Sequence, residues 1–557
     1  MTNSEIADQL SLLSKLIDIH GENAEQAKAL ATAAFTLEKI PQTVSKLSEE
    51  KLFALRNIGE NVGRTILEII QTEESEQLKR LLEATPEGVL QMLNIKGLGP
   101  KKINVLWKQL RIDNIKELQK ACIEHRLSAL KGFGEKTEQK ILDAIQFKKG
   151  NDGKYLYASI EDFTKDLHLK LKSKFPDNSF EITGEFRRQL EVISILEWVT
   201  TAPKEELKNY LLRTETEVLE ESNDQMTLLA NGSVKLRFHL SNEKSFAEKL
   251  FETSSSDEFL AEWRKKFSPT TAQTEEQIFL AQKLNFIPAF LRENTNSIDA
   301  AKRNSFDNLI QVDDIKGLIH SHSNWSDGVS TIEKMAEALV ELGFEYMVIS
   351  DHSKAAFYAN GLSEQKIIQQ HKYVDELNAK LHPFKIFKSI ECDILSDGSL
   401  DYDNDVLSTF DLVITSIHSN LQMNEEKAMM RLLGAINNPF TTILGHMTGR
   451  KLLQRNGYPV DHKAIIDACA ENNVVIEINA NPNRLDMDWR WIDYALEKNV
   501  MLSIDPDAHS IYEFQYVKYG VLVAQKGGLT AGNNLSSMSL KDFEAFLNTT
   551  KKKKKIN

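Results

Sequence analysis

The C-terminal third of the chain repeats one pattern that restricts its fold: a short apolar run that ends in a histidine or an acidic residue. The first run, residues 317–319, leads into His320 and His322. On a strand, residues two apart point to the same side, so this pair suits metal binding at a strand end. Later runs end in the same residue types, at Asp351, His352, Glu391, His418, His446, Asp507 and His509. One such pair would mean little, but the series predicts a metal site.

Helical stretches such as residues 331–342 separate these runs. Strands that alternate with helices predict a parallel sheet closed into a (β/α) barrel, in which chemistry gathers at the C-terminal strand ends. The histidines and acids of the series lie at such ends. Glu477, inside a run, and Asp393 are weaker candidates. Asp505 is an alternative to Asp507, but the Asp-x-His spacing favours Asp507.

Composition indicates an ordinary globular protein of several domains, because 557 residues are too many for one core. The chain is 41% hydrophobic and 27% charged, and we find no membrane span and no signal peptide. Its three cysteines, Cys122, Cys392 and Cys469, have no disulfide or zinc spacing, so we expect a cytoplasmic protein without a membrane partner. The net charge of -13 does not indicate nucleic-acid binding, although a whole-chain sum can hide basic surfaces.

Residues 1 to about 150 have helical spacing, and three segments (55–63, 93–102 and 130–136) place glycines before an amphipathic helix. The second and third match the helix-hairpin-helix pattern. Such glycines allow a tight turn whose backbone N–H groups bind phosphate without reading bases. Ordinary packing of helices is the alternative, which the repetition disfavours. The expected DNA contacts are Gly97, Gly99, Lys101, Lys102, Gly132, Gly134 and Lys136.

The middle of the chain resembles the bacterial X-family DNA polymerases, whose order is a helical N-terminal domain, helix-hairpin-helix fingers, palm and thumb. Gly184, Arg187 and Arg188, followed by a strand-like run at 192–199, resemble the start of the palm. Residues 274–279 and 286–293 resemble the end of the thumb.

Departures from this family are concentrated at the polymerase site. Its paired aspartate positions fall on Ile195 and Glu197, its third carboxylate on Lys235, and its phosphate-contacting serine on Glu185. Two-metal phosphoryl transfer needs carboxylates, which isoleucine and lysine cannot replace. We therefore expect a degenerate palm without polymerase activity.

The lysine that performs lyase chemistry in this family has no counterpart here. Its position falls on Thr65, beside Arg64. Schiff-base chemistry needs an amine, so we expect no lyase activity by that route.

Residues from about 315 to 530 resemble the PHP (polymerase and histidinol phosphatase) domain, which implies a distorted seven-stranded barrel with up to three divalent ions. The ligands implied are His320, His322, Asp327, His352, Glu391, His418, His446, Asp507 and His509. Glu391 would bridge ions, and His320, His322, Glu391, Asp507 and His509 would be catalytic. Mixed imidazole and carboxylate ligands suit Mn²⁺, Zn²⁺ or Fe²⁺. Of these three ions we expect Mn²⁺.

Other residues near this site have less certain roles by sequence. Asp351 is expected to be a supporting or structural residue that orients His352. Arg450 is either a phosphate contact or a surface residue. The terminal lysine run, residues 551–555, is of a type that is usually solvated and disordered.

Together these features predict five domains: a helical lyase-like domain (1–85), helix-hairpin-helix fingers (86–150), a nucleotidyltransferase-like palm (151–240), a thumb (241–307) and the PHP domain (315–550). We expect a monomeric PolX-type DNA repair protein that acts on gapped, nicked or 3′-ended DNA. Its barrel would be a 3′–5′ exonuclease or 3′-end phosphoesterase, with AP-endonuclease activity as a further possibility. The alternatives are a gap-filling polymerase with a proofreading barrel, a noncatalytic DNA-binding scaffold and a small-molecule phosphatase.

Overall fold

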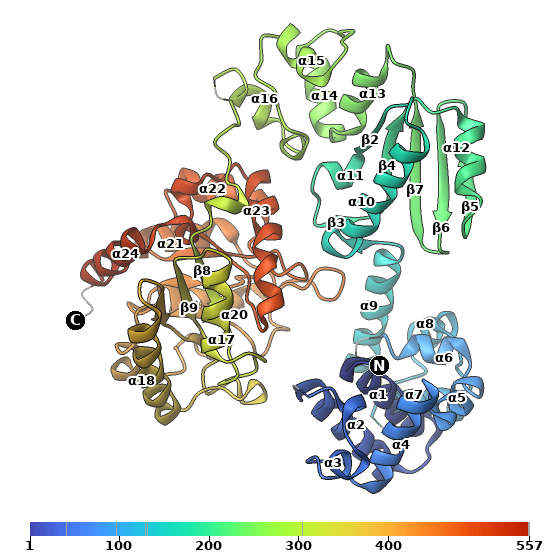
Figure 1. Ribbon diagram of the computed structural model, residues 1–557, viewed down its shortest axis with the longest axis vertical. Coiled ribbons are helices and arrows are strands. Elements are labelled where there is room, and N and C mark those ends of the chain that lie inside the picture. The colour runs from blue at the N-terminus through green and yellow to red at the C-terminus, as the bar shows by residue number, and fades with distance from the viewer. Residues whose placement is uncertain (41, 96, 129, 131, 304, 555–557) are drawn as a thin grey trace. The chain divides into compact units, whose positions relative to one another are not determined.

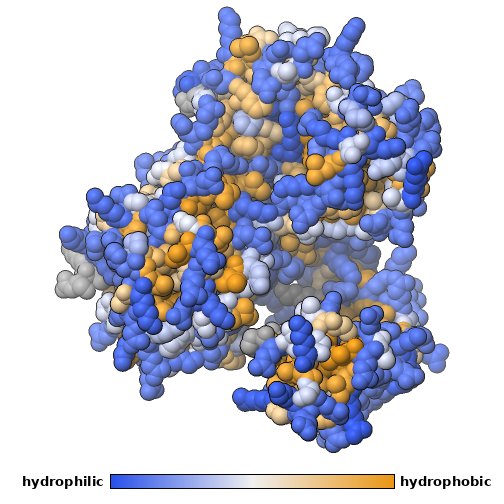
Figure 2. Space-filling model, in the orientation of Figure 1, coloured by the Kyte–Doolittle hydropathy of each residue, from blue (hydrophilic) through white to orange (hydrophobic). Residues whose placement is uncertain are grey.

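The computed structural model describes all residues except 41, 96, 129, 131, 304 and 555–557 (Figure 1). The chain forms two compact units, Met1–Asp152 and Gly153–Asn557. Hydrophilic side chains cover most of the visible face of the protein (Figure 2). Within the described residues, every helix is too short or too polar to cross a membrane.

The first unit is helical, as predicted. It consists of α1 (Asn3–His20), α2 (Ala24–Lys39), the 3₁₀ helix η1 (Val44–Lys46), α3 (Glu49–Phe53), α4 (Glu60–Thr72), α5 (Glu76–Glu83), α6 (Glu87–Met92), α7 (Pro100–Leu110), α8 (Ile115–Ile123) and α9 (Glu135–Asn151). The helices form because apolar residues recur at helical spacing; α4, for example, buries Val62, Ile66 and Ile69.

The second unit begins with a five-stranded sheet in the order β2-β4-β7-β6-β5, where β4 and β7 are parallel and the other pairs antiparallel. Its core contains Trp198 stacked on Phe238, with ring centroids 5.3 Å apart. The elements of this palm-like region are β1 (Tyr155–Leu156), α10 (Tyr157–Lys174), β2 (Phe180–Thr183), α11 (Gly184–Arg187), β3 (Val192–Ile193), β4 (Leu196–Thr200), α12 (Lys204–Leu211), β5 (Thr216–Glu221), β6 (Gln225–Ala230) and β7 (Val234–Leu240).

A helical region with an aromatic core follows. It comprises α13 (Phe246–Thr253), α14 (Asp257–Lys266), α15 (Glu275–Ala281), η2 (Ala289–Leu291) and α16 (Asn296–Ala300). Ion pairs fasten it to the palm-like region: Arg187 contacts Glu275 at 2.5 Å, and Arg188 contacts Glu293 at 2.7 Å.

The rest of the second unit is the predicted barrel, and all its strand pairs are parallel. The strands are β8 (Gly317–Ser321), β9 (Tyr346–Ile349), β10 (Lys385–Lys388), β11 (Glu391–Asp393), β12 (Ile414–Ser416), β13 (Ile443–Leu444), β14 (Val475–Asn479) and β15 (Leu502–Asp505). β10 pairs with β9, and β11, two residues further on, pairs with β12, so the two form one interrupted strand of a seven-stranded barrel. A bridge between Ser321 and Ala508 joins the first strand to the last.

Helices surround these strands (Figure 1). They are η3 (Val312–Asp314), α17 (Ile332–Glu341), η4 (Phe357–Ala359), α18 (Glu364–Leu381), α19 (Asn404–Leu407), α20 (Glu425–Ile436), α21 (His462–Asn472), η5 (Trp489–Trp491), α22 (Ile492–Glu497), η6 (Ile511–Tyr516), α23 (Val517–Lys526), η7 (Ala531–Asn533), η8 (Leu535–Ser537) and α24 (Leu540–Lys553).

The terminal lysines correct a prediction, because α24 extends through Lys553. The Lys551 ammonium donates to the carbonyl of Phe410 at 2.8 Å, and that of Lys554 donates to the carbonyl of Thr441. These side chains are ordered because carbonyl groups of the barrel bind them. Lys555 lies outside the described residues.

Candidate metal centre

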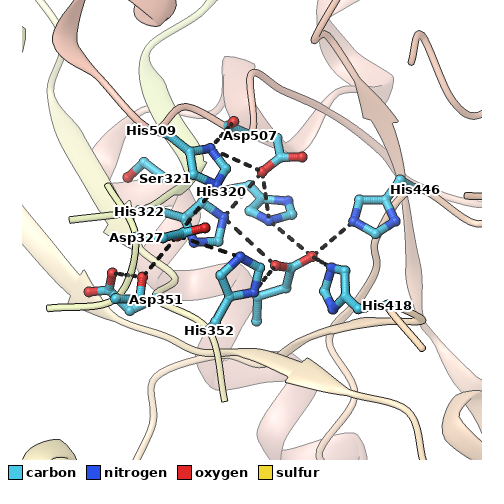
Figure 3. Close-up of polar contacts among 12 residues, drawn as sticks. His320, Ser321, His322, Asp327, Asp351, His352, His418, His446, Asp507 and His509 are labelled. Carbon is cyan, nitrogen blue, oxygen red and sulfur yellow. Dashed lines mark hydrogen bonds and ion pairs between the residues drawn. The ribbon is translucent and has the colours of Figure 1, made fainter. Parts of the chain in front are cut away.

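Glu391, at the start of β11, contacts a cluster of histidines. Figure 3 shows these histidines converging on one place in the barrel. Its side chain is buried, and its two carboxylate oxygens face five imidazoles. The ring nitrogens and their distances to the nearer carboxylate oxygen are His352 Nδ1 at 2.9 Å, His446 Nε2 at 3.0 Å, His418 Nε2 at 3.2 Å, His320 Nε2 at 3.4 Å and His322 Nε2 at 3.7 Å. One carboxylate therefore contacts imidazoles from four separate parts of the barrel sequence.

Two further carboxylates flank this centre. Asp507 Oδ1 lies 3.1 Å from His322 Nε2, and Asp327 Oδ1 lies 3.5 Å from His509 Nε2. The structure thus brings all nine predicted ligand positions into one cluster. Three sets of donor atoms, each within 4.8 Å, could hold an ion: His322, Asp327, His352 and His509; His320, His322 and Glu391; His352, Glu391 and His418. His446 and Asp507 contact members of these sets.

Backbone conformation explains how the first strand delivers its two histidines. His320 has a φ of 60°, and the pairing of β8 with β9 shifts register between Leu318 and Ser321. Asp507 also lies in the left-handed region, with a φ of 52°. Such conformations cost about 1–3 kcal/mol each for non-glycine residues and are found at functional sites. Simple strand alternation, on which the sequence argument relied, does not describe this turn.

Buried carboxylates orient several of these imidazoles. Glu477 accepts a short hydrogen bond from His320 Nδ1 and another from the backbone N–H of His446 at 2.5 Å. Asp393 lies 3.2 Å from Nδ1 of His418. The two weaker candidate ligands therefore hold ligand side chains from behind, an arrangement that is common around metal sites.

Asp351 differs from its predicted role. Its carboxylate accepts hydrogen bonds from the backbone and hydroxyl of Ser323, the hydroxyl of Ser326 and the amide of Gln370, at 2.5–2.8 Å. It therefore fixes the turn after β8 rather than the ring of His352. Asp505 accepts from the Ser503 hydroxyl at 2.6 Å and belongs to none of the donor sets found among the described residues.

The donor set fits divalent cations. His320 Nε2 is buried without a hydrogen bond although two carboxylates lie within 3.6 Å of it. An unsatisfied buried nitrogen among carboxylates is costly unless a ligand occupies the site. The combination of imidazole nitrogen and carboxylate oxygen suits Mn²⁺, Fe²⁺ or Zn²⁺.

Electrostatics keep the carboxylates ionised. Burial raises the pKa of Asp327, but the surrounding imidazoles outweigh it and lower this pKa to about 2. Burial likewise opposes ionisation of Glu391 and Asp507, yet neighbouring histidines hold both pKa values well below the ordinary value. Burial lowers the pKa of His418, while Glu391 and Asp393 raise it to about 10. Protons on imidazoles thus offset the negative charge of the carboxylates, which bound cations would offset in their place.

A cavity of about 400 Å³ opens onto the cluster and has a basic wall that the sequence did not reveal. Lys451, Arg455 and Arg484 line this wall, and Arg484 Nε lies 3.5 Å from Asp507 Oδ2. Arg484 follows β14, so its position in a loop after a strand end was the available signal. Cation side chains beside a metal cluster suit an anionic ligand.

Arg450 fits neither predicted alternative. It is largely buried, and its guanidinium donates to the carbonyl of Arg484 at 2.9 Å and to Asp488 at 2.7 Å. It therefore braces the loop that carries Arg484.

The palm-like site has a different chemistry. Glu185 accepts hydrogen bonds from the backbone and hydroxyl of Ser194, at 2.6 and 2.8 Å. Glu197 accepts from His239 at 2.8 Å, and the exposed Lys235 has no partner among the described residues. Ile195 lines a cavity of about 710 Å³ together with Glu185, Glu197 and Lys235. In the described part of the chain, every group of His, Cys, Asp and Glu side chains able to hold a metal lies in the barrel.

Gly184 explains the tight turn of this site. Its φ is 66°, and a Cβ there would lie 2.2 Å from a carboxylate oxygen of Glu197. Glycine is thus required both for the backbone and for the approach of Glu197.

The predicted hairpin glycines have the expected geometry. Gly97 and Gly132 have φ values of 92° and 91°, and Gly99 and Gly134 precede α7 and α9 without a side-chain cap. Lys101 and Lys136 are exposed, whereas Lys102 Nζ donates to the carbonyl of Gly97 at 3.2 Å. The first-turn N–H groups of both helices are therefore not satisfied by capping side chains.

The two residues at the position of the family's lyase lysine have local partners. Thr65 donates to the carbonyl of Asn61 at 3.2 Å, and Arg64 pairs with Glu60.

Comparison with known proteins identifies relatives for each region. Residues 1–75 match the helix-hairpin-helix domain family, residues 89–147 the SAM-like helix-hairpin-helix tandem and residues 319–481 the PHP domain. The Bacillus subtilis protein named DNA polymerase/3′-5′ exonuclease PolX is 32% identical over 578 residues, 98% of this chain and 99% of that protein. A probable phosphatase of Clostridium acetobutylicum is 34% identical over 109 residues, 19% of this chain and 42% of its own. A probable phosphatase of Clostridium novyi is 23% identical over 165 residues, 29% of this chain and 63% of its own.

Proposed function

The chain belongs to the bacterial PolX family with a C-terminal PHP domain, and on this premise we propose that it hydrolyses DNA phosphoesters at the barrel cluster. The reaction we favour is 3′–5′ exonuclease or 3′-end phosphoesterase activity, with incision at abasic sites as an additional activity. The observation that carries this proposal is the gathering of five imidazoles, from four parts of the barrel sequence, around the buried Glu391.

Divalent ions, Mn²⁺ before Zn²⁺ or Fe²⁺, would occupy the three donor sets around Glu391. When bound, they supply the positive charge that polarises a phosphoester for attack by water. Glu477 and Asp393 hold His320 and His418 in position for them. The ionised Asp327, Glu391 and Asp507 supply the negative charge that retains them.

The chain's own residues would bind and orient the substrate. Arg484 and Arg455 face the cavity, where they attract the phosphate of a DNA strand. Arg450 keeps Arg484 in place by binding its backbone. Ser323 and Ser326, fixed by Asp351, shape the turn that carries Asp327.

The helix-hairpin-helix units would supply affinity for DNA of any sequence. Uncapped first turns at α7 and α9 present N–H groups to phosphate oxygens, and Lys101 and Lys136 add charge. We propose gapped, nicked or 3′-ended DNA as the substrate of a cytoplasmic monomer.

The palm-like region would contribute shape rather than polymerisation. Ile195 cannot ligate a cation, Lys235 repels one, and Glu185 repels a nucleotide phosphate. The alternative is a gap-filling polymerase, which the name of the Bacillus subtilis relative favours.

One assay series separates these functions. The full-length protein is incubated with 5′-labelled gapped DNA and Mn²⁺, with and without dNTPs, beside His322→Ala. We expect shortening of the primer without dNTPs, no extension with them, and no shortening after chelation or in the variant.

A matched variant, His382→Ala, replaces an exposed histidine of the same domain and should behave as the parent protein. Extension of the primer would contradict the loss of polymerase activity. Unchanged shortening by His322→Ala would contradict the barrel as the active site.

A further inference from the structure

The loop after β9 holds two aromatic rings in solvent next to the cluster. Phe357 is 85% exposed, the highest value among the large hydrophobic side chains of the described residues, and Tyr358 is 62% exposed. Tyr358 lines the same cavity as Asp327 and His352. Exposed aromatic rings beside a functional cavity indicate a binding surface, because a ring in water lacks the stabilisation that burial of its apolar surface would give.

Local packing presents these rings outward. Ala356 and Ala359, on either side of the pair, are 1% and 2% exposed and fill the space beneath the loop. The backbone N–H of Ala355 donates to Asp401 at 2.6 Å, which fixes the loop from below. The small residues are thus buried and the large ones exposed, the reverse of what a loop stabilised by burial would show.

The two rings also form a surface of suitable shape. Their centroids lie 5.9 Å apart at an interplanar angle of 78°, so each ring offers a face in a different direction. Burial raises the pKa of Tyr358 to about 12, and the carboxylates of Asp393 and Glu391 add to this effect.

The cavity therefore combines a metal cluster, the basic Arg455 and Arg484, and an aromatic rim. A nucleotide carries a phosphate and, a few bonds away, a flat base. We propose that Phe357 and Tyr358 form a stacking site for an unpaired nucleobase adjacent to the phosphate at the cluster. This inference rests on the proposed function, since it places a DNA strand there.

Stacking on such rings distinguishes unpaired from paired strand ends and does not distinguish their sequences. Every base has a π-face, so aromatic platforms tolerate all four bases. A paired base in a duplex is already stacked and cannot leave without losing its partner. The site therefore favours frayed, mismatched or single-stranded 3′ ends over paired ones.

The test compares full-length protein with the double variant Phe357→Ala/Tyr358→Ala in Mn²⁺. Its substrate is a single-stranded 5′-labelled oligonucleotide, and a second one has abasic residues at its last two positions. In the double variant we expect KM for the complete oligonucleotide to rise about tenfold, within the range found for loss of stacking. KM for the oligonucleotide with abasic residues should change less than about twofold.

Binding provides a readout that does not depend on turnover. In the His322→Ala background, an oligonucleotide with 2-aminopurine near its 3′ end should show fluorescence quenching that the double variant abolishes. Tyr358→Phe, which keeps the ring, should retain the quenching. Ile368→Ala, which removes another exposed hydrophobic side chain of the barrel, should leave KM and quenching unchanged.

Equal losses on the two oligonucleotides, or no loss on either, would overturn the stacking site. Failure of the parent protein to shorten any DNA would instead refute the proposed function, and quenching in the His322→Ala background would still report on stacking. The two failures are therefore distinguishable.

Discussion

Glu477 lies outside the donor sets but supports two predicted ligands, because its two oxygens bind the ring of His320 and the backbone of His446. Glu477→Gln keeps the shape of the side chain but removes its charge and one acceptor. Loss of such a supporting carboxylate typically weakens metal affinity 10–100-fold, and we expect about that range here. Titration of Mn²⁺ into the full-length variant by calorimetry measures the change.

Glu341→Gln, at an exposed position of α17, is the control and should bind Mn²⁺ as the parent does. Unchanged affinity in Glu477→Gln would mean that His320 keeps its orientation without this carboxylate.

Lys526 should give stability a distinct pH dependence. Burial lowers its pKa from 10.5 to about 8, and its ammonium donates to the carbonyl of Arg188 at 2.7 Å. Between pH 8 and 10.5 the unfolded chain binds more protons at this side chain than the folded one, so the free energy of unfolding rises with pH. Across that window the rise is on the order of 2–3 kcal/mol.

Urea denaturation of the parent and Lys526→Met at pH 7.5 and 10 isolates this contribution. The parent should gain stability relative to the variant as the pH rises. Lys541→Met, at an exposed position of α24, should keep a constant difference from the parent. A difference between parent and Lys526→Met that stays flat would mean that Lys526 titrates as in water.

Sequence reasoning succeeded where residue type and strand position together carry the information. The nine predicted ligand positions come together because eight of them lie at or shortly after a short apolar strand, and Asp327 lies in the turn after β8. It failed where the orientation of a side chain determines its role: the carboxylate of Asp351 binds serines, and the guanidinium of Arg450 points into a loop. Arg484 follows a strand end, but that position alone did not reveal its role, which depends on how residues 484 and 507 meet across the barrel.

At the level of elements, the two hairpins allow a test of backbone-mediated DNA binding. Gly97 and Gly132 need a positive φ, so alanine there should lower the free energy of unfolding by about 1–2 kcal/mol each and weaken DNA binding. Gly99 and Gly134 have φ values of -81° and -85°, and a Cβ at either would meet nothing within 4 Å.

Gly99→Ala/Gly134→Ala should therefore leave stability unchanged while a methyl group hinders the approach of phosphate to the helix ends. Fluorescence anisotropy with labelled DNA and thermal melting measure the two effects separately. Full DNA affinity in this variant would contradict contact through the helix N-termini.

Periodicity predicted the classes of the elements but not their junctions. The barrel followed from strands alternating with helices, whereas the break between β10 and β11 depends on pairing with different neighbours. The helical ending of the chain was missed because a lysine run reads as solvated unless the carbonyls that bind it are known. Phe357 and Tyr358 gave no signal, since aromatic residues in a sequence are expected to be buried.

For the whole molecule, each compact unit has hydrophobic cores of its own, so each should fold alone. The fragment of residues 153–557 should retain Mn²⁺-dependent hydrolysis of a small phosphodiester within about twofold. Its affinity for gapped DNA should fall at least tenfold, and the slope of log affinity against log salt should become shallower because phosphate contacts are lost. Anisotropy titrations at several salt concentrations measure both; an unchanged slope would place the DNA contacts in residues 153–557.

The closure of the barrel between its first and last strands has a consequence for synthesis. His322 and Asp507 contact each other across 185 residues of chain. A ribosome that adds about 5–20 residues per second needs on the order of 10–40 s to make that interval. Until then Glu391 and the early histidines lack Asp507 and His509. Chains released early, by a premature stop or a damaged message, therefore never assemble the full set of ligands, and the cluster is completed only after residue 509 has been added.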